Sequence, residues 1–176
     1  MVFSDESGFF LMPNAKTTWA PKGHTPTVRL RLGYGRLNVL GGLVVSAGQR
    51  KIRLHALTTT GNVSSEEILL FMQHVLRHEP GLIFWIWDGA PIHDNDPVGR
   101  FVSAHPRLRL IQLPAYAPEL NPCELIWAQT EEQLSSRLIF NMNQLSLHVT
   151  QSLLRSRNSQ DLLWSCIYAS NLPWPR

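Results

Sequence analysis

The sequence predicts a single α/β domain in which a mixed β-sheet is covered by helices. Three features of its 176 residues indicate this fold. Residues 1–58 have the short apolar runs and turn residues of a strand meander, and from Ser64 onward apolar residues recur at helical spacing. Leu82–Trp87 is an uninterrupted apolar run, which is typical of a strand covered on both faces. A chain of this length can bury a substantial core without disulfides.

Residues 1–58 contain most of the expected strands. Val2–Asp5 is a short strand, and Phe9–Met12 is either its hairpin partner or a separate short strand. Two prolines and a glycine within residues 19–26 indicate a turn. Further strand candidates, bounded by turn residues that include 46–49, are Thr27–Leu32, Asn38–Val45 and Lys51–Leu57.

Helical periodicity begins after residue 63. Ser64 or Ser65 is the predicted N-cap of a helix that continues to about His78, where Pro80 and Gly81 end it. The buried strand at 82–87 follows. The remaining predicted elements are a short helix at 97–105, a strand at 107–113, and helices at 121–138, 142–155 and 160–169.

The composition is that of an ordinary globular protein, with 44% hydrophobic and 16% charged residues. A formal net charge of +3 and a pI near 9.2 are compatible with a polyanionic partner but are common in other proteins. Cys123 and Cys166 have no zinc-site spacing, so we expect two buried, reduced thiols. Since neither a signal peptide nor an apolar run of bilayer length is visible, we expect a cytoplasmic protein.

Asp88 is the first of three carboxylates that stand at the ends of predicted elements. It directly follows the buried strand, and ligands of open α/β sheets collect at the carboxyl ends of strands. The dipeptide Asp88-Gly89 is also ordinary turn sequence, so a structural role explains Asp88 equally well.

Glu124 is the second carboxylate, and it opens a predicted helix. Asn121 is a natural N-cap with Pro122 at the first helical position, so Glu124 fits the third position of a capping box, which is a structural role. However, Cys123 and Trp127 belong to the predicted buried stripe, and Glu124 lies at its border. A carboxylate at that border can reach a site at the rim of the sheet.

Asp5 is the third carboxylate, and it stands beside Glu6 at the end of the first strand. Successive side chains of a strand point to opposite faces, so Asp5 shares a face with Phe3 and Glu6 shares one with Ser4. We predict that Asp5 belongs to the site and that Glu6 is solvated.

Three acids delivered by three elements suit a divalent cation. Mg²⁺ prefers oxygen ligands and is typically held by a few carboxylates together with water and substrate phosphate. Two such ions about 4 Å apart can activate the attacking oxygen and stabilise the leaving oxygen in phosphodiester cleavage. The acids therefore predict a metal-dependent nuclease or transposase core.

Other conspicuous side chains have structural interpretations. We predict that His93 is a hydrogen-bonded structural residue. We interpret four tryptophans as core residues and not as platforms for stacking bases: Trp85, Trp87, Trp127 and Trp164.

At these residues the chain resembles the catalytic domain of mariner-like bacterial insertion-sequence transposases, which belong to the DDE superfamily. The segments that resemble the family's motifs are residues 3–9, the hairpin 18–26, residues 88–93 and residues 113–127. The last contains Pro-Ala-Tyr-Ala-Pro-Glu-Leu-Asn-Pro-Cys-Glu and is the most specific. Gly89 stands where the family usually has Asn, and the 35 residues between Asp88 and Glu124 are close to the family's usual spacing.

The resemblance implies a ribonuclease H-like fold, a mixed five-stranded sheet flanked by helices. It places Asp5 on the central strand, Asp88 after the fourth strand and Glu124 on the following helix. The same three residues take the catalytic and metal-binding roles, with two Mg²⁺ or Mn²⁺ ions. The implied activity is cleavage of double-stranded DNA at element ends, followed by strand transfer to a target by the released 3′-hydroxyl, in a homodimer.

Family members usually carry a helix-turn-helix region before the first acidic motif, whereas here that motif begins at Phe3. We therefore expect residues 1–176 to form a single catalytic domain, with a helix-turn-helix protein encoded separately or lost by truncation. The alternative function is a truncated, inactive remnant that acts as a binding or interaction module. A ribonuclease H-like enzyme acting on RNA–DNA hybrids is a third hypothesis, and the proline-rich segment 113–124 disfavours it. The resemblance also implies a bacterial protein that associates with the nucleoid when bound to DNA.

Overall fold

The computed structural model describes residues 1–11, 19–24, 35–46, 51–88, 96–135 and 137–174. Five strands form one mixed sheet in the order β3-β2-β1-β4-β5, with the first strand at its centre. Their bounds are β1 Val2–Phe10, β2 Arg36–Val45, β3 Ile52–Thr59, β4 Ile83–Trp87 and β5 Leu108–Gln112. The predicted α/β class and the mixed five-stranded sheet are confirmed.

The first three strands form an antiparallel meander, and the last two add to it in parallel. β1 pairs with β2 over its whole length, from Val2 opposite Val44 to Phe10 opposite Arg36. The prediction of a short first strand and a separate strand at 9–12 was wrong, because this long pairing keeps the chain extended through Gly8. The strand predicted at 27–32 and the turn predicted at 46–49 fall largely or wholly outside the described residues.

The helices agree closely with the sequence periodicity. Ser64 is the N-cap of the first helix, and it forms a capping box with Glu67. The predicted turn at 19–26 is described from Trp19 to His24, and it bends at Lys22 and Gly23. The bounds are α1 Ser65–His78, α2 Asp96–Ala104, α3 Cys123–Ser135, α4 Met142–Asn158 and α5 Gln160–Ala169. No helix in the described part is long and apolar enough to cross a membrane.

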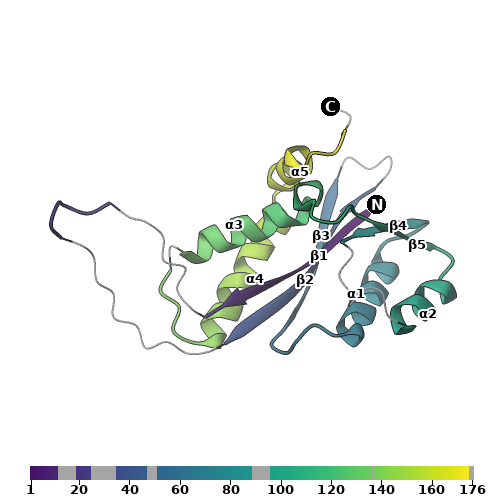
Figure 1. Ribbon diagram of the computed structural model, residues 1–176, viewed down its shortest axis with the longest axis horizontal. Helices are drawn as coiled ribbons and strands as arrows, with labels where there is room; N and C mark the ends of the chain where they lie inside the picture. The colour runs from purple at the N-terminus through teal and green to yellow at the C-terminus, as the bar shows by residue number, and fades with distance from the viewer. Residues whose placement is uncertain (12–18, 25–34, 47–50, 89–95, 136, 175–176) are drawn as a thin grey trace.

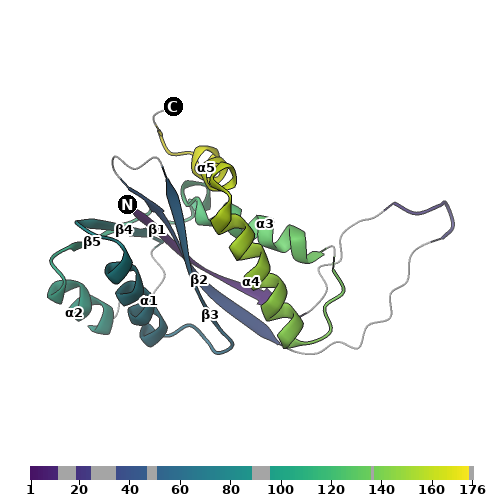
Figure 2. The same cartoon turned by 180° about the vertical axis from the view of Figure 1, so that it is seen from behind.

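Two hydrophobic cores lie on the two faces of the sheet. Helices α3, α4 and α5 cover one face, and α1 and α2 cover the other, as the front and back views agree (Figures 1 and 2). The alternation of strand side chains assigns Phe3 to the first core and its neighbour Val2 to the second. Asp5 therefore points to the face that carries α3, as its shared face with Phe3 predicted.

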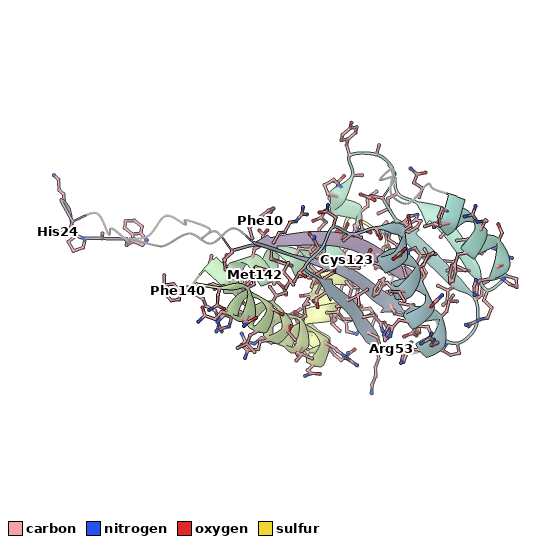
Figure 3. The ribbon with its side chains drawn as sticks, turned by 90° about the horizontal axis from the view of Figure 1, so that it is seen from below. Phe10, His24, Arg53, Cys123, Phe140 and Met142 are labelled. Carbon is pink, nitrogen blue, oxygen red and sulfur yellow. The ribbon has the colours of Figure 1, made fainter. Side chains whose placement is uncertain are left out.

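A charged network joins β3 to the end of α1. Glu79 is only 4% exposed, and its carboxylate accepts hydrogen bonds from Arg53 (Nε to Oε1, 2.7 Å) and from His55 (Nε2 to Oε1, 2.8 Å). Figure 3 shows Arg53 at the end of the sheet opposite Phe10. Burial opposes the ionisation of Glu79, but these hydrogen bonds and the two neighbouring charges hold its pKa below the usual value.

Glu79→Gln should destabilise the protein by about 2 kcal/mol at pH 7, because it removes the buried carboxylate that accepts hydrogen bonds from His55 and from the partly exposed guanidinium of Arg53. Folding lowers the pKa of the Glu79 carboxyl, so its ionised form stabilises the folded state at pH values above its ordinary pKa. This contribution to the free energy of unfolding is lost as the pH falls through the folded-state pKa. In urea unfolding experiments, the difference in free energy of unfolding between wild type and Glu79→Gln should therefore become smaller below about pH 4.5. Glu66→Gln, at an exposed position in the first turn of α1, is the control and should change little.

Candidate active site

The candidate site begins where β1 and β4 separate. Their parallel pairing covers only Val2 with Trp85 and Phe3 with Ile86. Asp5 lies two residues after Phe3, and Asp88 lies two residues after Ile86, so both acids stand at the same level beyond the last paired residues. Ligands of open α/β sheets bind at such a divergence of neighbouring strands.

Glu124 enters from the first turn of α3, after β5 and a short 3₁₀ helix at Pro118–Leu120. The capping-box interpretation is excluded by the partners of Asn121. Its backbone N–H donates to the Pro118 carbonyl oxygen at 2.9 Å, and its Oδ1 accepts from the Cys123 N–H at 3.2 Å. The helix start is thus capped without the Glu124 carboxylate, whose exposed side chain borders the cleft described next.

A cleft of about 440 Å³ opens at this end of the sheet. The three predicted acids, Asp5, Asp88 and Glu124, all line it. The rest of its described wall is the segment that leaves β5, namely residues 112–118 with Asn121. The structure therefore brings the predicted site residues together, although 119 positions separate the first from the last.

Electrostatics within the cleft favour a bound cation. Burial raises the pKa of Asp5 from 3.8 to about 7, against the lowering effect of a hydrogen bond from Trp127. The negative charges of Glu124, Glu6 and Asp88 raise the pKa of Asp5 further. The pKa of Glu124 is also raised, first by burial and then by the charge of Asp88. Without a cation, protonation of Asp5 is therefore favoured below about pH 7.

The donor set fits Mg²⁺ or Mn²⁺, since it consists of carboxylate oxygens in a cleft open to solvent. In the part of the chain that the structure describes, which omits 89–95 beside Asp88, no three His, Cys, Asp or Glu side chains are already arranged as a metal-binding group.

Sequence reasoning missed how α3 is fixed to the central strand. The Trp127 indole N–H donates to Asp5 Oδ2 at 2.8 Å, the Cys123 Sγ donates to the Phe3 carbonyl at 3.0 Å, and Asn121 Nδ2 donates to the Ser4 carbonyl at 3.3 Å. Figure 3 shows Cys123 inside the domain, between helix and sheet. The helical periodicity of the sequence predicted that Cys123 and Trp127 lie on a buried stripe, as they do. Apolar periodicity carries no signal for polar contacts to β1.

The other sequence predictions have mixed outcomes. Trp85, Trp87 and Trp127 are at most 5% exposed and Trp164 is partly buried, so all four contribute to cores as predicted. The two cysteines are free and buried, also as predicted. Glu6 is half-buried and does not line the acidic cleft, but lies in the wall of a separate pocket with Arg36 and Asn38. His93 lies outside the described residues.

A larger hollow, of about 630 Å³, lies at the opposite end of the sheet. Its wall is mostly apolar, and its acidic member, Glu79, is already paired with Arg53. Among the described residues of its wall no set of carboxylates is directed at one space, so we assign the candidate chemistry to the smaller, acidic cleft.

The strand order, the parallel addition of β4 and β5, and the acidic cleft at the β1–β4 divergence define a ribonuclease H-like domain. The chain belongs to the DDE superfamily endonuclease family, which matches residues 1–146. No curated protein sequence matches the chain.

Solved structures of Mos1 mariner transposase have the same fold. The paired-end complex with Mn is 16% identical with a TM-score of 0.71, and the paired-end complex with Mg is 16% identical with a TM-score of 0.70. Each alignment covers 95% of this chain and 51% of the Mos1 chain. The catalytic domain of Mos1 is 12% identical with a TM-score of 0.63, and the alignment covers 95% of this chain and 74% of that one. The chain thus spans about half the length of the Mos1 chains in the paired-end complexes.

Asp5→Asn should stabilise the cation-free protein at pH 8 by up to about 4 kcal/mol. Folding raises the pKa of Asp5 from 3.8 to about 7, so the folded state loses stability relative to the unfolded state as pH rises through this interval. Asparagine keeps an oxygen for the Trp127 N–H and carries no charge. Thermal unfolding in EDTA at pH 4 and pH 8 measures the effect, which should vanish at pH 4.

The control for this experiment is Glu119→Gln, an exposed carboxylate near the cleft that does not line it. Equal stabilisation by Glu119→Gln and Asp5→Asn would mean that general surface charge, and not the buried Asp5, produces the pH dependence.

Proposed function

We propose that residues 1–176 form the catalytic domain of a DNA transposase, which cleaves phosphodiester bonds at element ends and transfers the released strand. One observation carries the proposal: in a member of the DDE superfamily endonuclease family, three acids from β1, the end of β4 and α3 line one cleft. The proposed catalytic and metal-binding residues are Asp5, Asp88 and Glu124, and the proposed cofactor is a pair of Mg²⁺ or Mn²⁺ ions.

Each acid has a distinct setting. Asp5 is held on the central strand at 9% exposure, with one oxygen bonded to Trp127, so it provides a fixed ligand. Asp88 and Glu124 are exposed at the cleft, where they can adjust to a substrate phosphate. Bound divalent cations supply the charge that activates the attacking oxygen and stabilises the leaving oxygen. The chain's own contribution is to place the carboxylates on rigid elements around one space.

The proposed substrate is double-stranded DNA, both transposon ends and target, bound by a homodimer. Support comes from the Mos1 structures, which are described as paired-end and strand-transfer complexes. Tyr116 adds a local observation: it stands fully exposed in the wall of the cleft, with a left-handed backbone φ of 60°. An exposed aromatic ring beside the acids is suited to stacking on a base of a distorted or unpaired end. A separately encoded helix-turn-helix protein, or another part of a longer chain, would supply recognition of the end sequence.

Asp88→Asn should reduce metal-dependent cleavage by at least about 10³-fold, because it removes a carboxylate that acts only with the cation and the reacting phosphate. The substrate is a duplex carrying the inverted repeats that flank the coding sequence, incubated with Mn²⁺ and the protein with its DNA-recognition module. Product formation on a denaturing gel is the measurement, and Glu119→Gln is the control that should cleave normally.

Cleavage that persists in Asp88→Asn would contradict the proposed mechanism. A wild-type protein that folds, binds Mn²⁺ and cleaves no element end would instead support the inactive remnant. Preferential cleavage of an RNA–DNA hybrid would support the ribonuclease H alternative.

A further inference from the structure

Trp127 is hydrogen-bonded to Asp5, one of the proposed metal ligands. Its indole nitrogen lies 2.8 Å from Asp5 Oδ2, and both side chains are buried, at 4% and 9% exposure. An indole has a single N–H donor, and a carboxylate has two oxygens. The contact therefore uses one lone pair of Oδ2 and restrains the orientation of the whole carboxylate, while Oδ1 does not take part in it.

Gly41 makes this contact possible. It lies directly opposite Asp5 in the β1–β2 register. A Cβ at position 41 would stand 2.4 Å from Trp127 Cη2 and 2.7 Å from Cζ2, which is closer than atoms can pack. The Trp127 ring thus fills the space that a side chain at 41 would take, while Phe9 packs edge-on against it with ring centroids 6.2 Å apart.

The same helix supplies Glu124 and Trp127. Residues three apart on an α-helix are neighbours on its surface, so one turn of α3 directs a carboxylate into the cleft and an indole onto Asp5. Any shift of α3 relative to β1 would move both groups together.

We propose that Trp127 is a positioning residue for the metal site: its hydrogen bond fixes the orientation in which the Asp5 carboxylate would meet the cation, and Gly41 provides the space that the Trp127 ring needs. This inference rests on the proposed function, since it assigns Asp5 to a cation. Residues that hydrogen-bond to metal ligands typically change metal affinity by about 10–100-fold when they are replaced.

The test compares Mn²⁺ binding by calorimetry in Trp127→Phe, Gly41→Ala and wild type. Phenylalanine keeps an aromatic ring but lacks the N–H, and alanine at 41 displaces the ring that carries it. Both variants should bind Mn²⁺ about 10–100-fold more weakly. Phe9→Leu is the matched control, because it removes packing against the Trp127 ring and keeps the hydrogen bond. It should lose stability without a change in Mn²⁺ affinity.

A second measurement uses wild-type protein, so it does not depend on a variant that folds. In an ¹H–¹⁵N spectrum, the indole signal of Trp127 should shift when Mg²⁺ is added, because the cation withdraws charge from the carboxylate that accepts the bond. Trp85 and Trp164 lie outside the cleft and are internal references that should not shift.

Trp127→Phe with wild-type Mn²⁺ affinity, or a Trp127 indole signal indifferent to Mg²⁺, would overturn this inference and leave the proposed function intact. Wild-type protein that binds no Mn²⁺ would overturn both.

Discussion

The attachment of helix α3 to strand β1 is the constraint on which the site depends. Three consecutive residues of β1 accept hydrogen bonds from α3 and its cap: the carbonyls of Phe3 and Ser4, and the side chain of Asp5. All three contacts are buried, where an unpaired polar group costs free energy, so the helix has one favoured position along the strand. Because Asp5 is on the strand and Glu124 is on the helix, that position also sets the distance between two proposed ligands.

The buried carboxyl groups at the two ends of the sheet have pKa values shifted in opposite directions. At the end that carries Glu79, one carboxylate meets a guanidinium and an imidazole, so the protein itself satisfies the charge and its pKa is lowered. At the cleft, burial raises the pKa of Asp5 to about 7, the charges of Glu124, Glu6 and Asp88 add to this effect, and no described cationic group opposes it. The first arrangement stabilises the fold, whereas the second lowers stability in a way that a bound cation would reverse.

Most of the fold follows from local patterns in the sequence. The apolar run before Asp88, the capping box at Ser64 and the period of the C-terminal helices each predicted an element that the structure contains. The length of β1 could not be predicted, because Ser7 and Gly8 have low strand propensity and remain extended only through pairing with β2. The three acids were predicted from their places at element ends. The Trp127–Asp5 contact joins residues 122 positions apart and depends on the absence of a side chain at Gly41. No local sequence pattern predicts the contact or the need for glycine at position 41.

The proline-rich segment before α3 resolves the conflict between the two interpretations of Glu124. A glutamate in the first turn usually serves the helix N-terminus, and a carboxylate used in this way cannot also face a cleft. Here the backbone N–H of Asn121 donates to the Pro118 carbonyl of the 3₁₀ helix at Pro118–Leu120. The Asn121 side chain accepts the Cys123 N–H through Oδ1, which caps α3, and donates through Nδ2 to the Ser4 carbonyl of β1. Asn121 thereby both caps the start of α3 and attaches it to β1. The conformation of the segment, and not the identity of Glu124 alone, is what makes this carboxylate available for chemistry.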